Sequence, residues 1–310
     1  MPTTNNPLIT NWTPVETPDL TGKSFLITGG NSGIGFEAAK TLANKNADVV
    51  IACRNEKKGK QALAKIVNRG AGRCELLSLD LADSASIRAA AKEASERFGA
   101  IYGLINNAGV MQTPKQKTKD GFEMQLGVNH LGHFLWTALM IGQVDGRGGR
   151  VITVSSIAHK LARIDFDNLM LDRGYNPTQS YLRSKLANML FAQELHRRLD
   201  AAGSRIKSIA CHPGYSATPL FEKTANPISS FTQRASAAVF GQKQERGAWP
   251  TVLAASDERA VSGGYYGPTG FFDARGPVGD AIIEPRGRDP HAAKRLWEVS
   301  EELVGETPKV

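Results

Sequence analysis

The chain has 310 residues, of which 41% are hydrophobic and 22% are charged. These proportions are typical of a folded, water-soluble protein and exclude wholesale disorder, collagen-like repeats and coiled coil. Lys and Arg outnumber Asp and Glu by 38 to 30, which gives a net charge of +8. The positive charges are scattered and are not interleaved with aromatic residues, so no nucleic-acid partner is expected. The charge is still compatible with binding of a phosphate-rich cofactor.

Three features bear on where the protein works. The longest apolar run, Phe134 to Ile141, is far shorter than the ~18 residues that a membrane span needs. Residues 1–20 read as a polar N-terminal extension without the basic and apolar regions of a secretory signal. Cys53, Cys74 and Cys211 are too few and too widely spaced for a disulfide framework or a zinc site. We therefore expect a cytoplasmic protein with no membrane span and no metal.

From Lys23 onward, short apolar runs alternate with amphipathic stretches, which is typical of βαβ units. Strands are predicted at 25–27, 48–52, 74–79, 102–105, 150–154 and 206–210, with a last strand near 263–268, and helices at 34–46, 57–68, 84–98, 121–141, 180–199 and 291–303. Ser84 is the expected cap of the third helix. The prediction is one Rossmann-like α/β domain over residues 21–310, a doubly wound parallel sheet with helices on both faces. A small substrate lobe is expected at about 215–246, where periodicity is fragmentary.

A glycine-rich loop, Thr28 to Gly35, connects the first strand to the first helix. Its glycines follow the spacing G-x-x-x-G-x-G, a variant of the usual dinucleotide fingerprint. At such a turn, free backbone N–H groups and the helix dipole favour a pyrophosphate, although a tight turn without a ligand is the alternative. The residues expected at the cofactor are Gly29, Asn31, Ser32, Gly33, Ile34 and Gly35.

The end of the second strand bears on the choice of cofactor. Dinucleotide folds place an acidic residue there for NAD, or an Arg nearby for the 2′-phosphate of NADP. This chain has Arg54 and no carboxylate at that point, so NADP(H) is favoured over NAD(H). Asp80 and Leu81 end the third strand and are expected to flank the adenine, with a turn or capping role as the alternative for Asp80.

Tyr181 and Lys185 are four residues apart in a predicted helix, so both side chains lie on one face. An ammonium beside a phenol stabilises the phenolate, and we expect Lys185 to lower the pKa of Tyr181 toward the range of proton exchange with an alcohol or carbonyl. Such a pair is common on helix surfaces. Its combination with the glycine loop is what indicates catalysis.

The chain resembles the short-chain dehydrogenase/reductase family from Leu20 to about Gly270. Within the family it is most similar to the retinol-dehydrogenase-like and protochlorophyllide-reductase-like branch, which shares the lengthened segment before Tyr181. The motifs that carry the resemblance are Thr28 to Gly35, Asp80-Leu81, Asn106 to Gly109, Val128-Asn129-His130, Val154 to Ser156, Tyr181 to Lys185, His212-Pro213-Gly214 and Thr218; those of the branch are Ala52 to Arg54, Asn129 to Phe134, Ser155 to His159 and Ser184 to Asn188.

The resemblance implies a role for each of these residues. Tyr181 would be the general acid in carbonyl reduction and the base in alcohol oxidation, and Lys185 would also hold the nicotinamide ribose. Ser156 would hydrogen-bond the substrate oxygen, and Asn129 would hold a water of the proton relay. Further contacts with the cofactor are implied for Asn107, Ala108, Gly109, Pro213, Gly214 and Thr218.

The expected function is hydride transfer between NADP(H) and an apolar aldehyde, ketone or alcohol. The alternatives are a non-catalytic NADP(H)-binding sensor or interaction module, and a light-dependent reductase of a tetrapyrrole. The resemblance also implies homo-oligomers through the helices that carry Asn129 and Tyr181. We expect His159 to contact substrate, and Phe221, Phe231 and Phe240 of the lobe to line an apolar pocket or to pack a small core.

Overall fold

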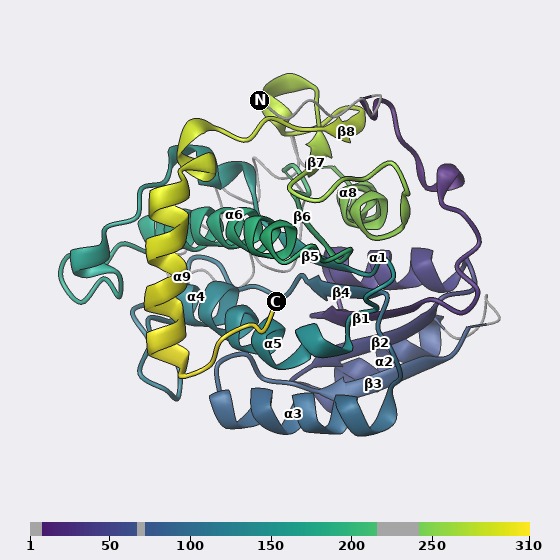
Figure 1. Ribbon diagram of the computed structural model, residues 1–310, viewed down its shortest axis with the longest axis horizontal. Coiled ribbons are helices and arrows are strands. Elements are labelled where there is room, and N and C mark those ends of the chain that lie inside the picture. The colour runs from purple at the N-terminus through teal and green to yellow at the C-terminus, as the bar shows by residue number, and fades with distance from the viewer. Residues whose placement is uncertain (1–7, 67–71, 216–241) are drawn as a thin grey trace.

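The computed structural model describes residues 8–66, 72–215 and 242–310. Within them, one eight-stranded sheet has the order β3-β2-β1-β4-β5-β6-β7-β8 (Figure 1). All neighbouring strands are parallel except β7 and β8. The strands are β1 (Ser24–Thr28), β2 (Asp48–Cys53), β3 (Cys74–Ser78), β4 (Gly103–Asn106), β5 (Arg150–Val154), β6 (Lys207–Cys211), β7 (Tyr265–Pro268) and β8 (Val278–Asp280). The predicted Rossmann-like α/β fold is confirmed.

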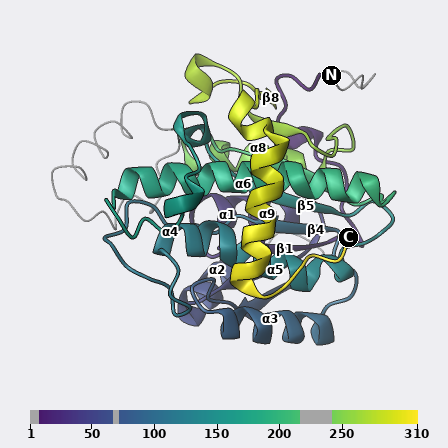
Figure 2. The same ribbon diagram turned by 60° about the vertical axis from the view of Figure 1, so that its left-hand side comes forward.

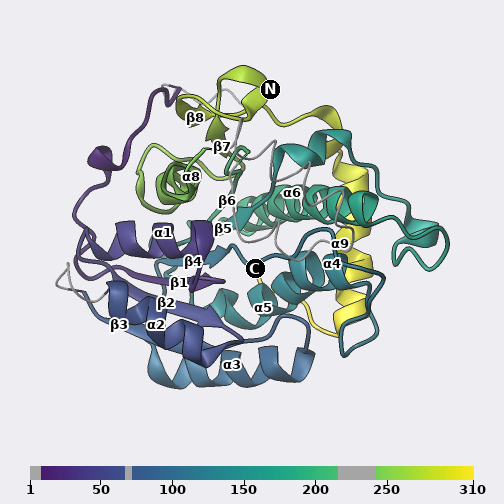
Figure 3. The same ribbon diagram turned by 180° about the vertical axis from the view of Figure 1, so that it is seen from behind.

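Helices cover both faces of the sheet because successive strand residues point to opposite sides. Phe25 and Ile27 of β1 pack in one core with α1, α2 and α8, whereas Leu26 packs in a second core with α3, α5 and α6. Figure 3 shows α1, α2 and α8 together on one side of the molecule. The helices are α1 (Gly33–Ala43), α2 (Glu56–Ile66), α3 (Ser84–Arg97), α4 (Met124–Leu126), α5 (Gly132–Met140), α6 (Pro177–Ala201), α8 (Gln244–Ser256) and α9 (Pro290–Val304).

The structure corrects several predicted boundaries. The cap of α3 is Asp83 and not Ser84, because the Asp83 carboxylate accepts hydrogen bonds from the N–H groups of Ala85 and Ser86. Helix α6 begins at Pro177, three residues earlier than predicted, since Asn176 caps it in the same way. Helix α8 and strand β8 were not predicted at all.

The helix predicted over 121–141 is divided by a π-helical turn. Residues Gly127–Leu131 (η2) lie between α4 and α5, and the Gly132 N–H donates to the Gly127 carbonyl five residues earlier. Asn129 is in this turn. π-helical turns occur frequently at functional sites, because the extra residue redirects a side chain that a regular helix would place elsewhere.

Residues 8–20 pack against the domain. The Trp12 N–H donates to the Val278 carbonyl of β8 over 2.9 Å, and the Asp280 N–H donates to the Ile9 carbonyl over 3.0 Å. The buried Trp12 indole donates to Asp257 Oδ2 over 2.8 Å. The stretch expected as an N-terminal extension therefore supplies part of the core and covers the edge of β8.

Helix α9 crosses the outer sides of α5 and α6, as the yellow helix in Figure 2 shows. Trp297 is 1% exposed; its ring stacks on Phe191 at 5.8 Å and contacts Phe134 at 5.0 Å. The buried His130 ring meets the Ser300 hydroxyl at 2.9 Å. The same chain thus covers the faces of the two helices through which the family resemblance implied oligomers.

Candidate active site

The predicted site residues follow the carboxyl ends of the central strands. Thr28 ends β1, Asn107 follows β4, Ser156 follows β5 and Pro213 follows β6. These ends share one edge of the sheet, and the strand order reverses between β1 and β4. In open α/β sheets ligands bind outside the carboxyl ends of the strands at such a switch point.

Ser156, Tyr181 and Lys185 come together there. The Ser156 hydroxyl lies close enough to the Tyr181 phenol to lower its pKa, and Lys185 Nζ lies 5.7 Å from the centroid of the Tyr181 ring. The buried Lys185 donates to the Val154 carbonyl over 3.1 Å, and Asn188 Nδ2 donates to the same oxygen. An ammonium has three N–H groups, so two of them remain for a ligand.

The ionisation of the pair differs from the expectation. Burial raises the pKa of Tyr181 to about 12, although the neighbouring Ser156 hydroxyl acts in the opposite direction. Burial also lowers the pKa of Lys185 to about 8. The predicted lowering of the Tyr181 pKa is therefore wrong here, because burial disfavours the charged phenolate. At neutral pH Tyr181 retains the proton that a general acid must donate.

Ser156 is held by a short 3₁₀ turn, η4 (Ile157–Leu161). The Ser156 hydroxyl accepts a hydrogen bond from the Ala158 N–H over 3.2 Å, and the Ser156 carbonyl accepts from His159 Nδ1 over 2.7 Å. His159 is fully buried, and the Tyr265 ring packs edge-on against it at 5.4 Å. In the described residues His159 fixes the backbone of Ser156, and its contact with substrate stays a prediction.

Asn129 connects two segments of the site. Its Oδ1 accepts a hydrogen bond from the Val110 N–H over 2.8 Å, and its Nδ2 donates to the Val110 carbonyl and to Ser184 Oγ, each over 2.9 Å. Ser184 in turn donates to the Tyr181 carbonyl over 2.8 Å. Asn129 thus fixes the chain after β4 against the helix that carries Tyr181. Both hydrogens of the Asn129 side-chain amide are donated to other residues of the protein. A relay water would therefore have to donate a hydrogen bond to the side-chain or backbone oxygen of Asn129.

Thr28 and His133 form a network that the sequence did not indicate. Burial lowers the pKa of His133 to about 4, so the ring is neutral, with one donor and one acceptor. Its Nδ1 faces the Asn129 carbonyl at 3.0 Å and must donate, so we assign Nε2 as acceptor from the Thr28 hydroxyl at 2.8 Å. Thr28 Oγ1 then accepts the N–H groups of Asn107 and Ala108, each over 3.0 Å. This network joins the glycine loop, the chain after β4 and the π-helical turn.

The glycine loop fits a dinucleotide phosphate. Gly29 and Gly33 have positive φ values of 69° and 59°. A Cβ on Gly35 would lie 2.3 Å from Asn107 Nδ2, and that amide already donates to the Thr28 carbonyl over 2.8 Å. Ser32 caps α1 without a side-chain hydrogen bond, so the first N–H groups of the helix face outward for an anion. Asn31 and Ile34 belong to the same loop and first turn.

Arg54 directly follows β2 and is exposed. Within the described residues it has neither an ion pair nor a side-chain hydrogen bond, so its guanidinium is available to a phosphate. The Asp80 carboxylate bonds to its own turn, because Oδ1 accepts a hydrogen bond from the Ala82 N–H over 3.0 Å. This contact agrees with the alternative prediction of a turn role for Asp80. Leu81 is 7% exposed and packs in the core beside α3.

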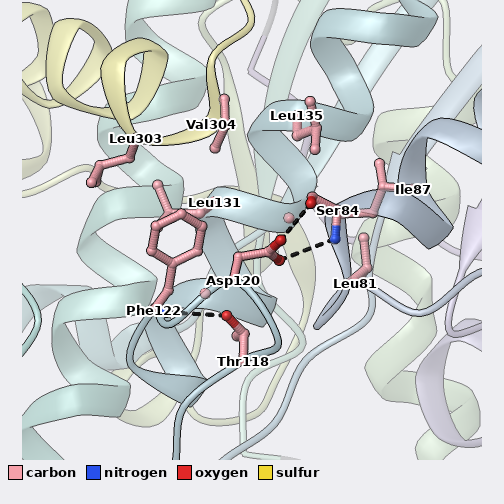
Figure 4. Close-up of a pocket in the computed structure, with 12 residues that line it drawn as sticks. Leu81, Ser84, Ile87, Thr118, Asp120, Phe122, Leu131, Leu135, Leu303 and Val304 are labelled. Carbon is pink, nitrogen blue, oxygen red and sulfur yellow. Dashed lines mark hydrogen bonds between the residues drawn. The ribbon is translucent and has the colours of Figure 1, made fainter.

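A pocket of about 60 Å³ borders Leu81 (Figure 4), and Ser156, Tyr181 and Lys185 are not among the residues that line it. It lies between α3, the π-helical turn, α5 and the end of α9. Asp120 accepts the Ser84 N–H over 3.0 Å on its wall, and Thr118 Oγ1 accepts the Phe122 N–H. Ligand pockets typically measure ~300–1,000 Å³. We therefore do not assign this pocket to the substrate.

The chain after β6 turns sharply at Gly214, where φ is 66° and a Cβ would lie 2.4 Å from the Ala274 carbonyl oxygen. Gln242 Nε2 donates to the Pro213 carbonyl over 2.6 Å. Thr218 and most of the predicted substrate lobe, with Phe221, Phe231 and Phe240, lie outside the described residues. The contacts predicted for them stay predictions.

The described ranges, residues 8–66, 72–215 and 242–310, bear on membrane and metal binding. They contain no helix that is both long and apolar enough to cross a membrane. Nor do three or more His, Cys, Asp or Glu side chains gather there as a potential metal site. His130 and His133 are instead hydrogen-bonded to Ser300 and Thr28, and burial lowers both pKa values.

A doubly wound sheet with a glycine loop and a Ser-Tyr-Lys cluster at its carboxyl edge defines a nucleotide-dependent oxidoreductase of the short-chain type. The model of the short chain dehydrogenase family matches residues 23–228, and the chain belongs to this family.

Its relatives include human Retinol dehydrogenase 11, 40% identical over 94% of this chain and 88% of the relative, and human Retinol dehydrogenase 12, 39% identical over 92% and 87%. Among solved structures, an uncharacterized protein from Mycobacterium Paratuberculosis is 36% identical with a TM-score of 0.81, covering 97% of this chain and all (100%) of that one. A short chain dehydrogenase from Burkholderia cenocepacia J2315 in complex with NADP is 27% identical with a TM-score of 0.62, covering 79% and 95%. The chain is thus retinol-dehydrogenase-like.

Proposed function

We propose that the protein reduces apolar aldehydes or ketones, or oxidises the corresponding alcohols, with NADP(H) as the hydride carrier. The observation that carries the proposal is the contact of Ser156 with Tyr181 beside the buried Lys185, at the sheet edge that also holds the glycine loop. When bound, NADP(H) supplies or accepts the hydride.

The residues of the chain would handle the substrate oxygen. Ser156 and Tyr181 would both donate hydrogen bonds to a carbonyl oxygen, which stabilises the charge that develops on it. Tyr181 would then transfer its proton to that oxygen, and the positive Lys185 would favour the phenolate that remains. In alcohol oxidation the same groups would act in the opposite direction.

Other residues would hold the cofactor. The N–H groups of the glycine loop and of the first turn of α1 would bind the pyrophosphate. Lys185 would use its two remaining N–H groups for the nicotinamide ribose, and Arg54 would pair with the 2′-phosphate. The NADP complex of the Burkholderia relative supports this choice, and the names of the retinol dehydrogenase relatives support an apolar substrate.

The test is oxidation of NADPH and NADH by the purified chain, in the dark, with a panel of apolar aldehydes, ketones and retinal. We expect turnover with NADPH preferred, and its loss in Tyr181→Phe with NADPH affinity within about threefold of the wild type, because only the proton donor is removed. Retained turnover in Tyr181→Phe would contradict the proton role. Binding of NADPH without dark turnover would favour a sensor, and activity confined to illuminated samples a light-dependent reductase.

A further inference from the structure

Two adjacent aromatic residues stand outside every core of the protein. Phe271 and Phe272 are 63% and 81% exposed. Their rings pack on one another at 4.6 Å and 77°. Two neighbouring large apolar side chains in water lose the stabilisation that burial would give, so such a pair indicates contact with something apolar.

The backbone that presents the pair is constrained. Phe272 and Asp273 have φ values of 48° and 56°, in the left-handed region that residues with a Cβ rarely adopt. The loop is closed at its base, where the Thr269 N–H donates to the Pro277 carbonyl over 2.8 Å. Strained conformations persist only where the surrounding structure imposes them, and they cluster at ligand-binding sites.

The loop is fixed to both sides of the reaction centre. Asp273 accepts a hydrogen bond from Lys160 over 2.6 Å, and Lys160 belongs to η4, the turn that begins directly after Ser156. On the other side, the Tyr215 N–H donates to the Ala274 carbonyl over 2.8 Å. Tyr215 directly follows Gly214, in the segment after β6. The aromatic pair is therefore held between the segment of the catalytic serine and the segment after β6.

We infer that Phe271 and Phe272 form an apolar platform that binds the hydrocarbon body of the substrate while its oxygen meets Ser156 and Tyr181. This inference rests on the proposed function and assigns it a substrate class: carbonyl compounds or alcohols with a long apolar body. A short substrate would reach the reacting residues without touching the platform. The rings therefore act on the affinity for long substrates and not on proton transfer.

The test compares Phe271→Ala/Phe272→Ala with the wild type, using retinal and propanal as the long and short substrates. We expect KM for retinal to rise about tenfold or more, with kcat and the KM for propanal changed less than about twofold. Val15→Ala, which removes an 85% exposed apolar side chain from the N-terminal segment, is the matched control and should leave all constants unchanged.

A binding measurement separates this inference from the proposed function. Quenching of tryptophan fluorescence by retinal in the NADP⁺-loaded Tyr181→Phe protein needs no turnover, and the two Phe→Ala changes should raise its Kd about tenfold in that background. An unchanged Kd, or equal losses for retinal and propanal, would overturn the platform. Loss of liposome binding or of self-association in the double variant, with retinal affinity unchanged, would assign the rings to a bilayer or to a second copy. Absence of turnover in the wild type would count against the proposed function alone.

Discussion

The proposed preference for NADP(H) over NAD(H) depends on the charge of Arg54, which directly follows β2. Because Arg54 is exposed and forms no ion pair within the described residues, Arg54→Asp should change cofactor preference without unfolding the protein. We expect the ratio of NADPH to NADH affinity to fall by about tenfold or more, since a guanidinium contact with the 2′-phosphate becomes a repulsion. Titration of each cofactor by fluorescence measures the ratio. Exposed Lys58 offers the control Lys58→Asp, and an unchanged ratio in Arg54→Asp would remove the argument for NADP(H).

The Thr28 hydroxyl fills all its hydrogen-bonding positions, and Thr28→Val retains its shape while removing them. The Ala108 N–H and His133 Nε2 would lose their partner, at a cost of about 1–3 kcal/mol for each buried group. We expect a lower free energy of unfolding in urea and a weaker affinity for NADPH, because the network positions the glycine loop. Thr28→Ser should restore both. In the control Thr41→Val the lost bond lies within α1, to the Glu37 carbonyl, and the change should stay within about 0.5 kcal/mol.

The difference between Thr28 and Tyr181 shows how far the sequence predicts this site. Tyr181 and Lys185 are one helical turn apart, so their proximity follows from spacing alone. Thr28 and His133 are separated by 105 positions, and only the folded sheet brings them together. The pKa of Tyr181 was predicted in the wrong direction for the same reason. Spacing indicates the neighbouring charge of Lys185 but not the burial that raises the pKa of Tyr181.

At the scale of elements, the predictions succeeded where one pattern persists over many residues. The five strands up to β5 and the helical segments between them follow period and polarity, and all are in the structure, although the last helical segment is divided by the π-helical turn. Strand β8 pairs antiparallel with β7. It has only three residues, which is too few to show an alternation of apolar and polar residues in the sequence. Helix α8 contains Pro250, an interior residue that argues against a helix in any local pattern. The π-helical turn at Asn129 could not be predicted either, because the residues that form it do not differ in type from those of a regular helix.

The N-terminal segment gives a prediction about stability. Trp12 is 1% exposed and hydrogen-bonds Asp257, which directly follows the last residue of α8, so Trp12→Ala creates a cavity and removes a buried hydrogen bond. We expect the free energy of unfolding to fall by about 3–5 kcal/mol in urea titrations, with little change in cofactor affinity. Val15 is three residues away and 85% exposed, which makes Val15→Ala the control. A loss below about 1 kcal/mol in Trp12→Ala would show that the segment only rests on the domain.

For the whole molecule, helix α9 decides which surfaces remain available to a second copy. Its Trp297 fills the space beside Phe134 of α5 and Phe191 of α6, and Arg198 lies 4.4 Å from the centroid of the Trp297 ring. A partner subunit would have to displace this packing before it reached the two helices. The sequence did predict a helix at 291–303, but which surface it covers depends on the tertiary fold.

We therefore expect no assembly of this chain through the outer faces of α5 and α6. Hydrogen exchange measured at rising protein concentration should leave the peptides of α5, α6 and α9 unchanged, because an intramolecular contact does not depend on concentration. If light scattering shows an oligomer, the peptides that become protected from hydrogen exchange should lie outside α5, α6 and α9. Trp297→Ala should loosen α9 and increase exchange in α5 and α6, whereas Lys294→Ala, at an exposed position of the same helix, should not. Protection of α5 and α6 that grows with concentration would show that a second copy displaces α9 or packs beside it.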